Sequence, residues 1–86
     1  MPRYFFNVYD GIASIDKIGT DFPSLKDAKH EAVRRAGQLL RDNTGSIANG
    51  EDWHLETVDK FGLVLFRLDI LATDAPVARP DPLMKR

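Results

Sequence analysis

Residues 24–42 read SLKDAKHEAVRRAGQLLRD, and this stretch decides the fold because it predicts one amphipathic helix near the centre of the chain. Ser24 stands at the N-cap position, and Asp27 follows three residues later. This approximate capping box also places a negative charge at the positive end of the helix. Apolar residues then recur with a period of 3.6, which is typical of a helix with one buried face. That stripe consists of Leu25, Ala28, Ala32, Ala36, Leu39 and Leu40.

Three of the stripe residues are alanines, and small side chains allow a helix to lie close against a sheet. The helix is expected to end near Asp42, since Asn43 and Gly45 follow. Residues 44–52 then predict a polar loop. Gly37 costs roughly 1 kcal/mol against alanine inside a helix, and it falls on the solvent side, where the sequence shows no packing reason for it.

A hairpin is predicted before the helix. Residues 3–9 alternate as a strand that directs Tyr4, Phe6 and Val8 to one face. The pair Asp10-Gly11 supplies the positive φ that a tight hairpin turn requires. Residues 12–18 then return as a second, weaker strand, with a bulge or bend at the glycine that follows.

A second hairpin is predicted after the helix, with strands over residues 53–58 and 63–70 and a turn over residues 59–62. From residue 73 onward, prolines stand among small and charged residues, which is typical of an extended tail. We therefore expect a single domain over residues 1–72 and a Pro-rich C-terminal tail over residues 73–86.

Two hairpins around one helix predict an α+β fold of the ββαββ type. It would be a four-stranded antiparallel sheet with the helix packed on one face. The predicted core consists of Tyr4, Phe6, Val8, Ile15, Phe22, Leu25, Ala28, Ala32, Ala36, Leu39, Leu55, Val64, Phe66 and Leu68.

Composition narrows the function classes. The 86 residues carry 12 basic and 13 acidic side chains, a net charge of -1, so the chain has no overall field that would attract nucleic acid or an anionic membrane. It has no cysteine, which excludes disulfides and thiolate chemistry. No stretch approaches the ~20 apolar residues of a membrane span. The expectation is a cytoplasmic protein with no membrane contact.

The sequence resembles a family of short alphaproteobacterial proteins classed as a domain of unknown function, over residues 1 to about 70. The matching motifs, in order, are the start MPRYFF, Val8-x-Asp10-Gly11, Asp16-x-x-Gly19-Thr20, the helix opening Leu25-x-x-Ala28, and Val58-Asp59-x-x-Gly62. The resemblance implies a bacterial, cytoplasmic protein, and it brings no activity, cofactor or catalytic residue with it.

The residues that carry chemistry favour structural roles. The acidic residues near Gly11 and Gly19 fit turns better than a metal or phosphate loop, and residues 42–52 do not fit a calcium-binding loop. His54 and Glu56 lie on one side of a strand and could exchange protons, but no motif supplies a nucleophile, so a solvated cross-strand pair is favoured. No catalytic, metal-binding or cofactor-binding residue is predicted, and the chain is not expected to be an enzyme.

The outer face of the sheet, opposite the helix, is too apolar to be comfortably solvated. Its predicted interaction surface consists of Arg3, Phe5, Tyr9, Val58, Leu65 and Arg67. Three occupants remain open: a protein partner or second copy, the Pro-rich tail through Val77, Leu83 and Met84, or single-stranded nucleic acid stacked on the aromatic rings. The leading hypothesis is a non-enzymatic interaction or regulatory module that self-associates through this open face. The alternative is a small single-stranded nucleic-acid-binding domain.

Overall fold

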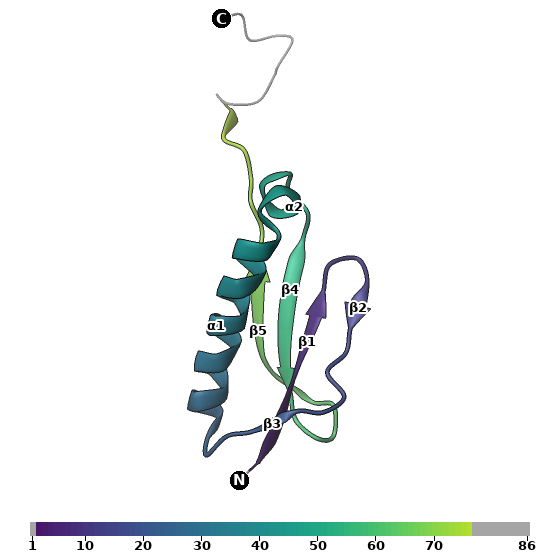
Figure 1. Ribbon diagram of the computed structural model, residues 1–86, viewed down its shortest axis with the longest axis vertical. Helices are drawn as coiled ribbons and strands as arrows, with labels where there is room; N and C mark the ends of the chain where they lie inside the picture. Colours follow the sequence, from purple (N-terminus) through teal and green to yellow (C-terminus); the bar gives the residue numbers. More distant parts are fainter. Residues whose placement is uncertain (1, 77–86) are drawn as a thin grey trace, which may run out of the picture.

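The computed structural model describes residues 2–76, which form an antiparallel sheet with one long helix on one face (Figure 1). The elements are β1 (Arg3–Tyr9), β2 (Ala13–Ser14), β3 (Thr20–Asp21), α1 (Leu25–Asp42), α2 (Thr44–Ala48), β4 (Trp53–Val58) and β5 (Val64–Ile70). The strand order is β2-β1-β4-β5, and the two-residue β3 pairs with the start of β1. The predicted α+β fold is therefore confirmed.

The helix α1 is capped at both ends, by Ser24 at its start and by Asn43 at its end. The Ser24 hydroxyl accepts a hydrogen bond from the Asp27 N–H and donates one to the Asp27 carboxylate. At the other end the Asn43 N–H donates to the Leu39 carbonyl. Ala28, Ala32 and Ala36 are all buried, so the alanine stripe is the face that approaches the sheet.

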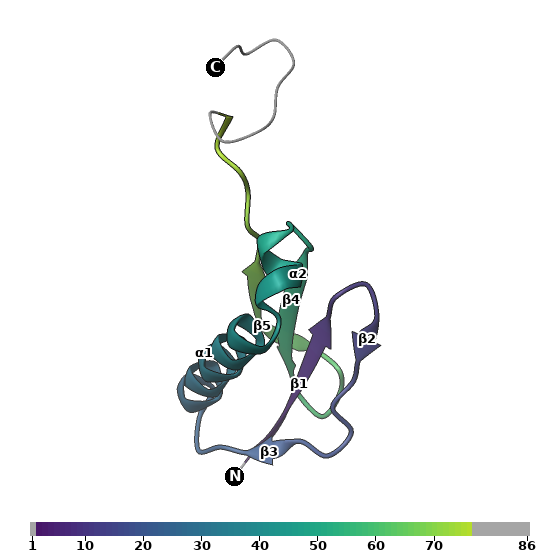
Figure 2. The same ribbon diagram turned by 45° about the horizontal axis from the view of Figure 1, so that its top comes forward.

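The helix covers only part of the sheet. It contacts β4 and β5 and runs along their side of the molecule, away from β2 (Figures 1 and 2). The core cluster lies beneath it and consists of Tyr4, Phe6, Ala28, Ala32 and Leu55. Ile47, Trp53 and Thr57 are also buried, although sequence analysis did not place them in the core. Val58 was expected on the open surface of the sheet but is only 7% exposed.

Three local predictions were wrong. The second strand is only Ala13–Ser14 long, and Ile15 is half exposed instead of lying in the core. Residues 44–52 are not wholly a loop, because they begin with the five-residue helix α2, which buries Ile47. Val64 was expected in the core but is 46% exposed.

Asp16 explains why the second strand stops early. One oxygen of its carboxylate accepts the Phe6 N–H at 3.2 Å, and the other accepts the N–H groups of Ile18 and Gly19 at 3.0 Å. The carboxylate thus takes the place of a neighbouring strand beside the middle of β1, between the stretches that pair with β2 and β3. Because the chain turns here, Ile15 does not continue the alternation of a strand.

These hydrogen bonds also set the ionisation of Asp16. Partial burial raises its pKa, but the three N–H donors and the charge of Arg35 outweigh that effect, so the pKa of Asp16 lies below its usual value. The bend is completed by Gly19, whose φ of 77° favours glycine. A Cβ at this position would lie 2.8 Å from side-chain atoms of Arg3 and Phe5. The Asp16-x-x-Gly19 motif therefore has a structural role, because it holds this segment against the edge of β1.

We predict that Asp16→Asn lowers the free energy of unfolding by about 1–3 kcal/mol, because the amide NH₂ would face the Phe6 N–H or the pair from Ile18 and Gly19. Urea unfolding at neutral pH measures the change. The control is Asp10→Asn, since Asp10 accepts only the Ile12 N–H at an exposed turn. Equal losses in the two variants would contradict this role for Asp16.

Candidate functional site

The strand register divides the outer face of the sheet into three rows. In each row the residues of β1, β4 and β5 are direct cross-strand partners, and alternation turns them away from α1. The rows are Phe5–Val58–Val64, Asn7–Glu56–Arg67 and Tyr9–His54–Asp69. Only the first row is apolar, so the outer face is less uniformly apolar than the sequence predicted.

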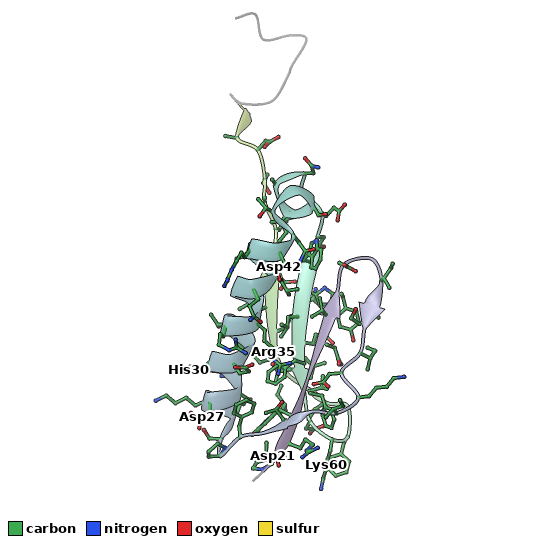
Figure 3. The ribbon with its side chains drawn as sticks, viewed as in Figure 1. Asp21, Asp27, His30, Arg35, Asp42 and Lys60 are labelled. Atoms are coloured by element: carbon green, nitrogen blue, oxygen red, sulfur yellow. The ribbon has the colours of Figure 1, made fainter. Side chains whose placement is uncertain are left out.

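The apolar row lies at the end of the sheet that carries the β4–β5 turn. Val64 of this row and three side chains near it are between 46% and 84% exposed, and we call these four the turn-end cluster: Ile18, Phe61, Leu63 and Val64. Arg3 connects its two sides, because it donates to the Ile18 carbonyl and lines one groove with Phe61. Asp21 and Lys60 lie at this same end (Figure 3). Four of the nine exposed large hydrophobic side chains among the described residues therefore gather at this end.

Leu65 does not lie on the outer face, where it was predicted. The register passes from Thr57↔Phe66 to Val58↔Val64, so Leu65 is an extra residue in β5. This bulge lets Leu65 pack against the core cluster and puts Val64 outside. The expected places of these two residues are therefore exchanged.

The charged residues of the predicted surface are paired. Arg3 donates to both carboxylate oxygens of Asp21, at 3.0 and 3.3 Å. Arg67 binds Asp69 at 3.0 Å and lies 3.8 Å from Glu56. Burying these rows against a second sheet would require removing these charges from water, which is costly.

Tyr9 and His54 form a stacked pair, with ring centroids 4.6 Å apart. The His54 Nε2 lies 3.7 Å from the Glu56 Oε2, so the two residues that could exchange protons do come together. Tyr9 and His54 also border a shallow hollow of about 400 Å³, otherwise lined by Asp10, Gly11 and two acidic residues, Glu51 and Asp52. Within residues 2–76, no group of three or more histidine or acidic side chains could hold a metal ion.

This geometry does not support stacking of nucleic-acid bases. One face of Tyr9 is covered by His54, and Phe5 lies against Gly19. The nearby arginines are paired with carboxylates, which would compete with phosphate groups. The sequence also suggested that the Pro-rich tail covers the outer face of the sheet. The tail residues named for this role, Val77, Leu83 and Met84, lie outside the described residues.

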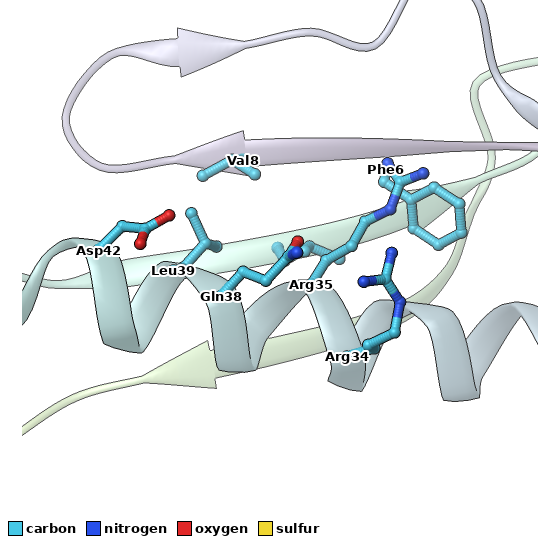
Figure 4. A pocket seen from close by; sticks show the side chains of 8 residues that line it. Phe6, Val8, Arg34, Arg35, Gln38, Leu39 and Asp42 are labelled. Carbon is cyan, nitrogen blue, oxygen red and sulfur yellow. The ribbon is translucent and has the colours of Figure 1, made fainter.

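A second hollow, which sequence analysis missed, lies between α1 and β1 on the other face (Figure 4). Phe6 and Val8 from β1 and Leu39 from α1 supply apolar lining, and Arg34, Gln38 and Asp42 stand at its rim. It exists because α1 lies nearer to β5 than to β2. The guanidinium of Arg35 partly fills the space, 4.3 Å from the Phe6 ring centroid, a cation–π contact.

Comparison with known proteins identifies a family. The sequence matches the domain of unknown function DUF6894 over residues 3–72. The chain belongs to this family. Comparison with curated proteins and with solved structures gives no significant match. This match confirms the resemblance to a domain of unknown function that the sequence motifs indicated.

The described helices of this DUF6894 chain include none with the length and apolar character needed to cross a membrane. His30 is exposed on the outer side of α1 (Figure 3).

Glu31 holds both arginines of the α1–β1 hollow. Its carboxylate accepts two hydrogen bonds from Arg34, at 2.6 and 2.8 Å, and one from Arg35 at 2.8 Å. The hydrogen bonds from Arg34 are the largest cause that lowers the pKa of Glu31 from 4.5 to about 2. Because the folded-state pKa is lower than the unfolded value, this stabilisation is complete above pH 4.5 and is lost as the pH falls toward 2.

We predict that Glu31→Gln lowers the free energy of unfolding by about 1 kcal/mol at pH 5 and by almost nothing at pH 2. The effect is smaller than the pKa shift alone would imply, because solvent screens the exposed Arg34. Urea unfolding across this pH range measures the difference. The control is Glu51→Gln, which removes an exposed carboxylate outside the Glu31–Arg34–Arg35 cluster and is measured over the same pH range. A Glu31→Gln difference that stays constant with pH would refute the prediction.

Proposed function

We propose that this protein is a non-enzymatic protein-interaction module that self-associates, and that it acts in the cytoplasm. The observation that carries the proposal is the exposed apolar surface of the described residues. It comprises the turn-end cluster and the side of the molecule formed by β5 and α1, where Val33 and Leu40 are 54% and 46% exposed. Exposed apolar groups of this extent favour contact with another protein.

The polar groups support a binding role over catalysis. His54 and Glu56 are engaged with Tyr9 and Arg67, and the hollow beside His54 is lined otherwise by a turn and by acidic side chains. Proton transfer between His54 and Glu56 would still need a nucleophile or a positioned substrate group. Association needs only the exposed apolar surface.

The sequence predicted self-association through the open sheet face. The cross-strand rows leave less apolar surface on that face than the prediction assumed. Two of the three rows carry paired charges, so a face-to-face contact would be limited to the apolar row and the turn-end cluster. The alternative contact is the β5 side. Both routes give a second copy of the chain as the partner.

Light scattering on the full chain at micromolar concentration tests this function, and we expect a dimer. Phe61→Asp reports on the turn-end cluster, because Phe61 is 84% exposed and the change leaves the core intact. Ile12→Asp is the matched control, since Ile12 is similarly exposed at the β1–β2 turn. A dimer lost only in Phe61→Asp would locate the contact at the turn-end cluster, and a dimer kept in both variants would locate it elsewhere. A wild-type monomer at every concentration would overturn the proposed function.

A further inference from the structure

The strand β5 forms a free edge of the sheet. Among the described residues it pairs only with β4, so every second residue directs its N–H and C=O groups away from the sheet. β5 contains no proline, and none of its seven residues is fully buried. A long edge strand of this kind is a template for pairing with another strand.

The sequence of β5 is complementary to itself in one antiparallel register. If two copies pair so that Leu68 faces the Leu68 of the second copy, Arg67 faces Asp69 on the outer side of the joined sheet. On the helix side, Phe66 then faces Ile70. Every such pair is either apolar with apolar or positive with negative, and pairs of both kinds stabilise an antiparallel sheet.

Neighbouring registers lack this match. A two-fold axis at Arg67 would place two arginines directly opposite each other, and an axis at Asp69 would do the same with two carboxylates. Like charges in direct cross-strand positions are destabilising. The charges of β5 therefore favour the register centred on Leu68, which is the one that places Arg67 opposite Asp69. These side chains are accessible, since those of Arg67 and Asp69 are 49% and 56% exposed.

The helix presents an apolar stripe to the same edge. Lys29 lies over the Phe66 ring, 5.5 Å from its centroid, so this side of α1 faces β5. Val33 and Leu40 follow at helical spacing on that side and are half exposed. Gly37 stands next to them, and nothing lies within 4 Å of the position where its Cβ would be. A glycine here leaves space at the surface of α1 for a neighbouring helix.

The spacing of the joined sheet suits contact between the two helices. Strands lie about 4.8 Å apart, so a helix over β4 and β5 is centred about 5 Å from the axis between two paired β5 strands. The two helices would then lie about 10 Å apart, at the upper end of the range for packed helices.

We infer that two copies of this chain pair antiparallel through β5, centred on Leu68, and form one continuous sheet with both α1 helices packed side by side on one face. The inference rests on the proposed function for self-association itself and adds the surface and the register. Both outer faces lie on the opposite side of the joined sheet, so the two turn-end clusters stay free.

Charge reversal tests the register. Arg67→Asp places two carboxylates opposite each other at both symmetric positions, and Asp69→Arg does the same with arginines, so each variant alone should dimerise at least about tenfold more weakly than wild type. Mixing the two variants makes both cross-strand pairs opposite in charge, and the mixture should regain the wild-type dimer. A change confined to the fold of each copy would not be repaired by mixing.

The controls separate charge from position. Lys17→Asp reverses the same charge beyond the opposite edge of the sheet and should leave the dimer intact. Val33→Glu places a charge in the helix contact at an exposed position, and it should weaken the dimer by a similar factor while circular dichroism shows an unchanged fold. Sedimentation velocity of each chain and of the mixture measures the dimer fraction.

The outcomes distinguish the inference from the proposed function. A wild-type monomer would overturn both. A wild-type dimer that is unaffected by Arg67→Asp, Asp69→Arg and Val33→Glu would overturn the β5 pairing and leave self-association standing. Single variants that are monomeric and stay so when mixed would also overturn the pairing. Recovery of the dimer in the mixture supports the inference.

Discussion

The width of a single helix is the constraint on which the rest of this structure depends. An α-helix is about 10 Å across, and strands lie about 4.8 Å apart, so one helix covers about two strands. The buried alanine stripe lets α1 lie close to the sheet, where it contacts β4 and β5. The hollow beside β1 and the apolar side of α1 above β5 both follow from this placement.

The two edges of the sheet are treated differently. The edge of β1 is occupied by β2 and β3, with the Asp16 carboxylate accepting the Phe6 N–H between them. Gly19 lets that segment lie against Arg3 and Phe5. On β5 no comparable cover exists among the described residues. One edge of the sheet is therefore covered by the chain itself, and the other is not covered by any described residue. This difference is expected of a sheet whose second edge pairs with another chain.

Local sequence patterns predicted the fold because each one acts over a few residues. The Ser24 cap, the period of the alanine stripe and the Asp10-Gly11 turn all depend on near neighbours. The errors arose where distant residues decide. Ile15 leaves the strand because Asp16 binds β1, and Leu65 enters the core because a bulge shifts β5 against β4. No pattern within either segment announces these long-range contacts.

The predicted surface residues show the same division. Alternation directs Arg3, Phe5, Tyr9 and Arg67 away from α1, but it could not show that the charged ones find partners or that Val58, expected on the open surface, is buried. Those partners matter for function. Arg3 with Asp21, His54 with Tyr9, and Arg34 and Arg35 with Glu31 use the groups that would otherwise attract a ligand. Besides the buried Trp53 Nε1 and Thr57 Oγ1, which have no hydrogen-bond partner, the described chain leaves apolar surface and a strand edge uncovered, and a second polypeptide chain would cover both at once. Because pairing through β5 leaves both outer faces on one side and the strands antiparallel, the dimer would present two turn-end clusters to further partners, one toward each end of the joined sheet.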